Sequence, residues 1–168
     1  DRVYERLGSR IGTTEEQREI SAAFAGAGLL LLLGGLGTGL RWRGRLVTDG
    51  VCFVCPRVKF EIGKGAKVHL GRWSWIGHGT KIRAHEGEVH IGAKSVIGQE
   101  CTVSSFQHVS IGRECIVADR VMLIDFDHGV VEVERPIRMQ GIYKKDVRVG
   151  HNVWVGYGAC FLRGVTVG

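Results

Sequence analysis

The strongest constraint on the fold of this chain is an aliphatic residue that recurs at every sixth position. Glycine often follows that aliphatic residue, and the residue four positions after it is small or β-branched. A period of six is neither the 3.6-residue period of a helix nor the two-residue alternation of a simple strand. Four runs carry the repeat: Leu70, Ile76 and Ile82; Ile91, Ile97 and Val103; Ile111, Val117 and Leu123; and Val149, Val155, Phe161 and Val167.

This hexad repeat predicts stacked coils of short parallel strands joined by tight turns. Each coil exposes an apolar edge that the next coil buries, so that the core continues along the stack. We expect the repeated glycines to lie at corners where a side chain would obstruct the backbone. The sequence therefore predicts an all-β domain over residues 46–168, preceded by an appendage over residues 1–45.

The hexads, three to a coil, resemble the left-handed parallel β-helix of the hexapeptide-repeat acyltransferases. The resemblance covers residues 46–168 and implies that fold. Sugar O-acetyltransferases, sugar-nucleotide N-acyltransferases, γ-type carbonic anhydrases and noncatalytic scaffolds share it, so function has to be argued from the site. Because Gly168 falls inside a hexad, we expect a further coil and a C-terminal cap beyond it.

The one long break in the repeat lies between Leu123 and Val149. An interruption of this length has to leave the coil, and long loops on rigid scaffolds often carry function. We predict an excursion loop over residues 129–146, with His128 at its root.

The residues around the interruption resemble the maltose and galactoside O-acetyltransferase branch of the family. In that branch a catalytic histidine precedes a loop, and a proline, a VWIG segment and a GVTIG segment follow in order. Here the order is His128, Pro136, VWVG at 153–156 and GVTVG at 164–168. The resemblance implies that His128 is the general base of acyl transfer from acetyl-CoA.

Histidine suits this chemistry, because its ordinary pKa of about 6.5 allows it to accept a proton from a hydroxyl at neutral pH. A carboxylate could hold the required tautomer, and both Asp125 and Asp127 are close in sequence. The phase of the hexad places Asp127 in the small interior position. We therefore expect Asp125 or a backbone carbonyl to be the partner of His128.

The resemblance also implies a binding channel for acetyl-CoA between two subunits of a homotrimer. Trp154, Gly156 and Tyr157 match positions that line this channel, and a backbone N–H near Gly156 could stabilise an oxyanion. The branch has an asparagine that positions the acceptor, whereas 97–101 reads IGQEC. A saccharide acceptor is expected, and a small sugar, a polysaccharide and a glycolipid all stay open.

Three other functions stay open beside the O-acetyltransferase. A zinc enzyme of the γ-carbonic anhydrase type would use histidines, and His85 and His90 have the spacing of two of its ligands. The third ligand position falls on Asp49, so we expect no metal. A noncatalytic scaffold would not need His128 at the root of the excursion. An N-acyltransferase acting on a sugar nucleotide would use the same kind of base.

The first 45 residues lie outside the repeat. Residues 13–16, TTEE, have the form of a capping box that opens a helix. The segment 21–40 has no charged residue. It is long enough to span a bilayer, but glycines make it less apolar, and the basic run 41–45 follows it. We predict a helical segment. It could pack on the β-helix or a neighbouring subunit, attach to the inner face of the membrane through 21–45, or span the membrane.

Charge and cysteine content narrow the partners and the compartment. The net charge of +6 suits anionic ligands, but the basic residues are scattered without an aromatic array, so we expect no nucleic acid. Five cysteines and no evident secretory signal indicate a reducing, cytoplasmic location. Cys101 and Cys115 fall in the small interior position, and Cys52 and Cys55 form a lone CxxC motif, which is a weak zinc or redox signal.

Overall fold

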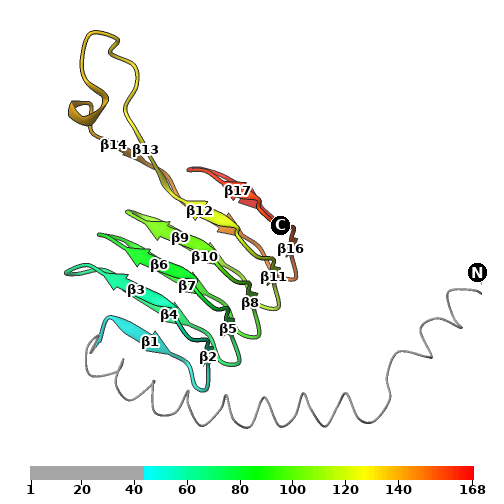
Figure 1. The fold of residues 1–168 in the computed structure, drawn as a ribbon. Coiled ribbons are helices and arrows are strands. Elements are labelled where there is room, and N and C mark those ends of the chain that lie inside the picture. The colour runs from blue at the N-terminus through cyan, green and yellow to red at the C-terminus, as the bar shows by residue number, and fades with distance from the viewer. Residues whose placement is uncertain (1–43) are drawn as a thin grey trace, which may run out of the picture. The chain divides into compact units, whose positions relative to one another are not determined.

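The computed structural model describes residues 44–168, which form a β-solenoid with three parallel sheets as its walls (Figure 1). The predicted parallel β-helix is confirmed. The expected N-terminal helix and the uncharged segment 21–40 lie outside the described residues. Within residues 44–168, no helix has the length and apolar character that a membrane span requires.

Each coil contributes one strand to each sheet, and the strands of one sheet lie side by side along the stack. The first sheet contains β1 (Leu46–Thr48), β4 (Lys67–Leu70), β7 (Glu88–Ile91), β10 (His108–Ile111), β15 (Val147–Val149) and β18 (Thr166–Val167). The second contains β2 (Phe53–Val54), β5 (Trp75–Ile76), β8 (Val96–Ile97), β11 (Ile116–Val117) and β16 (Trp154–Val155). The third contains β3 (Lys59–Ile62), β6 (Lys81–Ala84), β9 (Thr102–Ser105), β12 (Met122–Ile124) and β17 (Cys160–Phe161).

The aliphatic residues of the hexads form the core, as the repeat predicts. Residues at equivalent positions of successive coils pair across the sheets, so that similar side chains stack in columns along the axis. One column of the third sheet runs through Phe60, Ile82, Val103, Leu123 and Phe161. Its three middle members are fully buried. Burial therefore continues from coil to coil, and the parallel register is fixed by the core.

The small positions of the hexads also point inward. Cys101 and Cys115 are fully buried, which confirms their predicted place in the core, and they are free thiols. Buried Thr80 and Ser95 donate their hydroxyl hydrogens to backbone carbonyls at the next corner, those of Gly98 and Gly112. These bonds satisfy polar groups that the tight turns would otherwise leave unpaired inside the stack.

The glycines of the hexads allow the corners of adjacent coils to approach closely. A Cβ atom built on Gly92 would lie 2.4 Å from the carbonyl carbon of Gly112, which is backbone of the next coil. The left-handed backbone of the corner falls two residues later, at Lys94 with φ of 58°. The close packing of successive corners, and not a positive φ, therefore selects glycine at this position.

One coil carries a long insertion. In the first sheet, Val68 pairs with Val89 of the next coil, and Val89 pairs with Val109. Val109 then pairs with Val147, so the inserted chain lies between these two strands in the sequence. The inserted chain forms a two-stranded hairpin of β13 (Phe126–His128) and β14 (Ile142–Lys144), with a short 3-10 helix, η1 (Ile137–Met139), in its distal part. Figure 1 shows this hairpin projecting away from the stacked coils. We refer to residues 126–144 as the excursion hairpin.

Candidate functional site

The excursion hairpin begins immediately after the third sheet, before the position 129 that the repeat predicts. Its strands are antiparallel, with Phe126 opposite Lys144 and His128 opposite Ile142. The amide of Gly129 continues the pairing by donating to the carbonyl of Gly141 at 3.1 Å. His128 is thus carried on a paired strand, whose backbone is better fixed than that of an open loop.

The first end of the hairpin is held by a buried carboxylate. Asp125 is fully buried, and its oxygens accept three hydrogen bonds of 2.8 Å. The donors are the hydroxyl of Ser105 and the backbone amides of Phe106 and Gln107, all from the corner of the preceding coil. These three hydrogen bonds compensate the buried carboxylate for the hydration that it loses on burial. Asp125 therefore locks the point where the chain leaves the coil.

The second end of the hairpin is held at the same corner. The side-chain amide of Gln107 donates to Asp146 at 2.6 Å, and Arg148 donates to the other oxygen of Asp146 at 2.7 Å. The hydrogen bond from Arg148 is the main reason that the pKa of Asp146 lies below its ordinary value. The backbone amide of Lys145 also donates to the carbonyl of Asp125 at 2.9 Å. Both ends are thus fixed to one corner and to each other.

Aromatic rings pack under the base of the hairpin. The rings of Phe106 and Phe126 meet edge to face with centroids 4.6 Å apart, and His85 stacks on Phe106 at 4.5 Å. Lys144 lies over the Phe106 ring, with Nζ 5.3 Å from its centroid, and pairs with Glu86 at 2.5 Å. Edge-to-face rings and a cation over a ring face are favourable arrangements. This cluster fixes the direction in which β13 and β14 leave the coil.

His128 lies exposed above this base. Within the described chain, its ring has no hydrogen-bond or ion-pair partner. Asp127, its neighbour, forms an ion pair with Arg163 of the following coil. An accessible imidazole on an anchored strand can accept a proton from a bound hydroxyl.

The prediction that Asp127 occupies the small interior position is wrong. Side chains of β12 alternate inward and outward, so that Leu123 and Asp125 point inward, and the chain leaves the coil directly after Asp125. Asp125 is brought near the root of the hairpin, but its oxygens are occupied by Ser105, Phe106 and Gln107, and the structure does not pair it with His128.

The predicted channel residues lie on the second sheet and the corner that follows it, and not on the excursion hairpin. Trp154 is on β16 of the second sheet and is 79% exposed, and Tyr157 is exposed at the next corner. Arg120 donates to the hydroxyl of Tyr157 at 3.1 Å. A Cβ atom on Gly156 would meet nothing within 4 Å, so its backbone is open to a ligand. These three residues form one open surface, and the structure does not join it to His128 within one chain.

The outer face of the second sheet carries a continuous line of apolar side chains. They occupy equivalent positions on five successive strands, and Val96, Ile116 and Trp154 are more than one-third exposed. A contiguous exposed apolar patch on a soluble fold marks an interaction surface. We call this line the apolar ladder; it consists of Phe53, Trp75, Val96, Ile116 and Trp154.

The aromatic cluster could have been predicted from the sequence by comparing residues one coil apart, although the position of each residue within its hexad does not reveal it. His85, Phe106 and Phe126 occupy the corner after the third sheet in three successive coils, at separations of about one coil length. The zinc alternative paired His85 with His90, but the structure stacks His85 on Phe106 and His90 on His69. Aligning the sequence by whole coils, and not only by hexads, places each of these histidines beside the ring on which it stacks.

Comparison with known proteins supports the family expected from the hexads. The chain is 35% identical over 132 residues to Probable acetyltransferase Rv3034c of Mycobacterium tuberculosis, covering 73% of this chain and 41% of that protein. It is 23% identical over 124 residues to Putative lipopolysaccharide biosynthesis O-acetyl transferase WbbJ of Escherichia coli, covering 68% of this chain and 63% of that protein. The predicted resemblance to the hexapeptide-repeat acyltransferases is confirmed. The sequence matches no protein-family model.

A solved N-acyltransferase shares the fold. The structure of AntD, an N-acyltransferase from Bacillus cereus in complex with dTDP and coenzyme A, superposes with a TM-score of 0.54. Its sequence is 13% identical, and the match covers 78% of this chain and 71% of that one. At this identity the likeness is one of fold. The chain spans less than two thirds of the length of either curated acetyltransferase relative, 41% and 63% respectively.

Proposed function

We propose that this chain is the acyl-transfer domain of a coenzyme A-dependent O-acetyltransferase that modifies a saccharide hydroxyl. The observation that carries the proposal is His128, an accessible imidazole on a hairpin whose two ends are fixed by Asp125 and Asp146. The acetyltransferase names of the two curated relatives support the reaction class. The lipopolysaccharide name of one relative favours a saccharide acceptor.

In the proposed reaction, His128 accepts the proton of the acceptor hydroxyl as its oxygen attacks the thioester carbonyl. A carbon–oxygen bond forms, the carbon–sulfur bond breaks, and the proton passes from the imidazolium to the departing thiolate. General-base catalysis of this kind contributes roughly 10²–10⁴ in rate. Asp125 acts as a positioning residue, because it fixes the backbone three residues before His128 and does not touch the ring.

Acetyl-CoA is proposed to bind along Trp154, Gly156 and Tyr157. The two rings are exposed and the glycine backbone is open to approach, which suits an extended pantetheine arm. Trp154 lies on the second sheet of the solenoid, whereas His128 lies on the excursion hairpin, which leaves the solenoid after the third sheet. A site that uses both sets therefore takes them from two neighbouring copies of the chain.

A homotrimer provides such pairs of copies, and the apolar ladder is the surface that we propose to bury between them. Its exposed members Val96 and Ile116 gain from removal from water, and Trp154 lies at the end of the ladder, on the edge strand β16, beside the proposed acetyl-CoA site. A cytoplasmic location, with attachment to the inner membrane surface through residues 21–45, is part of the proposal. That segment lies almost entirely outside the described residues.

The test is release of free thiol from acetyl-CoA by the full-length protein, with monosaccharides, oligosaccharides and polysaccharides as acceptors. His128→Ala should lower kcat by roughly 10²–10⁴ and leave acetyl-CoA affinity nearly unchanged. His78→Ala is the matched control, because His78 lies away from the excursion hairpin on the second corner of its coil. Sedimentation of the same preparation reports whether the protein is a trimer.

Three results would overturn the proposal. If His128→Ala releases thiol as fast as the parent, His128 is not the base. If the parent binds no acetyl-CoA, a noncatalytic scaffold replaces the enzyme. Transfer to an amino sugar nucleotide, with no transfer to hydroxyl acceptors, would identify an N-acyltransferase that uses the same base.

A further inference from the structure

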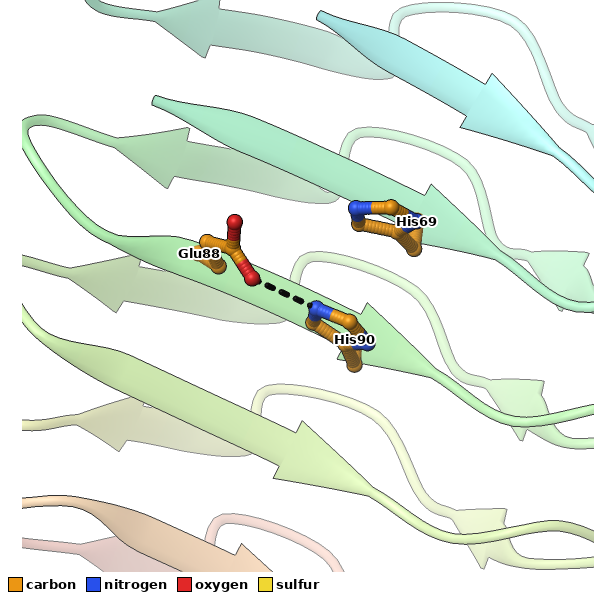
Figure 2. Close-up of side chains that lie close together, drawn as sticks. All are labelled: His69, Glu88 and His90. Atoms are coloured by element: carbon orange, nitrogen blue, oxygen red, sulfur yellow. Dashed lines mark hydrogen bonds and ion pairs between the residues drawn. The ribbon is translucent and has the colours of Figure 1, made fainter. Parts of the chain in front are cut away.

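A second group of chemically active side chains lies on the outer face of the first sheet, on other strands than the excursion hairpin. His69 on β4 pairs directly with His90 on the adjacent β7, and Glu88 precedes His90 by two residues on the same face. Figure 2 shows the two imidazole rings lying over one another, with a nitrogen of each ring on the side of the Glu88 carboxylate. The ring centroids are 4.2 Å apart.

The donor atoms of these three side chains converge. One nitrogen from each histidine and one carboxylate oxygen of Glu88 all lie within 4.8 Å of one another. Nε2 of His90 is already 3.0 Å from Oε2 of Glu88. Tetrahedral zinc, with bonds of about 2.0–2.1 Å to nitrogen and oxygen, requires donors about 3.4 Å apart. To bind one ion, the two stacked rings would have to rotate until both nitrogens face it, and the partial exposure of His90 and Glu88 leaves room for this rotation.

The backbone beneath the cluster is rigid. Val68 and Leu70 flank His69, Val89 and Ile91 flank His90, and these four aliphatic residues are buried in the core. A slip of the register between β4 and β7 would turn the aliphatic residues outward, so the core holds His69 opposite His90. The donors are therefore placed by the fold before any ion binds, which lowers the entropic cost of binding.

The electrostatic surroundings of the cluster favour the forms that can bind a metal ion. Burial, followed by the neighbouring His90, lowers the pKa of His69. The hydrogen bond from His90 lowers the pKa of Glu88, so its carboxylate is ionised. Lys67 and Asp49 lie close enough to influence His69 and oppose one another in charge. Neutral imidazole and ionised carboxylate are the forms that coordinate metal.

We propose that His69, Glu88 and His90 form a binding site for a divalent transition-metal ion, with zinc as the best-suited ion. Two imidazoles and one carboxylate are a ligand set that zinc uses when water completes its coordination. The side chains of His90 and Glu88 are 39% and 42% exposed, so the remaining position faces solvent. His108 lies opposite Glu88 on β10, with its ring centroid 5.0 Å from that of His90, and is not among the three donors that lie within 4.8 Å of one another.

This site is separate from the proposed acyl-transfer site. The cluster lies on the outward face of β4 and β7, whereas His128 lies on β13 and Trp154 on the second sheet. A bound ion would link two successive coils through His69 and His90. Its binding can therefore be measured without any assay of acyl transfer, and failure of one proposal leaves the other standing.

The test is calorimetric titration of the full-length, chelator-treated protein with zinc chloride, with magnesium chloride as the hard-cation comparison. We expect one zinc ion per chain with micromolar or tighter affinity, an increase in Tm on binding, and no measurable magnesium binding. Cobalt binding should give the intense visible absorption of a four-coordinate ion. His69→Gln, His90→Gln and Glu88→Gln should each weaken zinc binding by about 10-fold or more.

His78→Gln is the matched control, because it removes an imidazole from the turn between β5 and β6, outside the first sheet, and should leave zinc affinity unchanged. Circular dichroism confirms that each variant is folded. The proposal is overturned if the folded parent binds zinc only at millimolar concentration. It is also overturned if His69→Gln and His90→Gln bind zinc as tightly as the parent, since the ion would then bind elsewhere.

Discussion

The coils and the excursion hairpin are stabilised by different interactions. In the coils, every complete turn buries aliphatic side chains that stack on those of the next turn, as Ile82, Val103 and Leu123 do. Within the hairpin, the stretch 130–139 is exposed throughout, and the hairpin is held at its base by Asp125 and Asp146. The coil is thus a hydrophobic stack, and the excursion is a polar attachment to it.

This difference explains how the stack tolerates an insertion. The first-sheet strands of the coils before and after the hairpin, β10 and β15, pair directly, with Val109 opposite Val147 and Ile111 opposite Val149. The core therefore passes the hairpin without a gap. The exposed part of the hairpin contributes no core contacts, so its sequence can vary and it can hold functional residues. The coils keep the base of the hairpin in place.

The largest difference should appear when one aliphatic residue is shortened in each region. Leu123→Ala removes a fully buried side chain and should lower the free energy of unfolding by about 2–5 kcal/mol. Ile137→Ala, on the 54% exposed Ile137 of η1, should change it by no more than about 0.5 kcal/mol. Urea denaturation measures both. Equal losses would show that the hairpin is packed as the coils are, which would break the comparison.

A smaller effect is expected from the polar attachment itself. Asp125→Asn keeps the size of the side chain but leaves at least one of the Phe106 and Gln107 amides facing a donor or unpaired. We expect a loss of about 2–3 kcal/mol, because hydrogen bonds to a buried charged group are being removed. Asp127→Asn is the control: its ion pair with Arg163 is partly exposed and should contribute at most about 1 kcal/mol. Urea denaturation at neutral pH compares the two.

If both asparagine variants lose the same free energy, Asp125 is not the anchor that its three hydrogen bonds indicate. Hydrogen exchange gives a second view of the same question. The amides of Phe106 and Gln107 should exchange faster in Asp125→Asn and stay protected in Asp127→Asn, since only Asp125 accepts from them.

The sequence was sufficient for the coils because their determinants are local and periodic. Each hexad contributes one aliphatic residue and one small residue, and the pattern of Ile97 and Cys101 repeats in Val117 and Val121 with little change. The period alone then predicts which side chains point inward. The interruption was equally visible, because the period stops after Leu123.

The sequence was insufficient where contacts depend on coil length. The coil from Val68 to Val89 is 21 residues long, whereas three hexads are 18, and the additional residues lie at the corner after the third sheet. Hexad phase therefore placed Asp127, and not Asp125, in the core. For the same reason it did not bring His69 beside His90, which are separated by the same 21 residues.

Shortening the excursion hairpin should also change stability only slightly. Replacing 132–139 by an Asn-Gly turn keeps β13, β14 and both anchors, and it removes only exposed residues. Loop length contributes slowly to the free energy of folding, so unfolding should change by less than about 1 kcal/mol. If the removed residues cover the acyl-transfer site, thiol release should fall although His128 stays in place. A loss of stability comparable to that of Leu123→Ala would instead mean that the distal hairpin supports the coils, and the two regions would no longer be distinct.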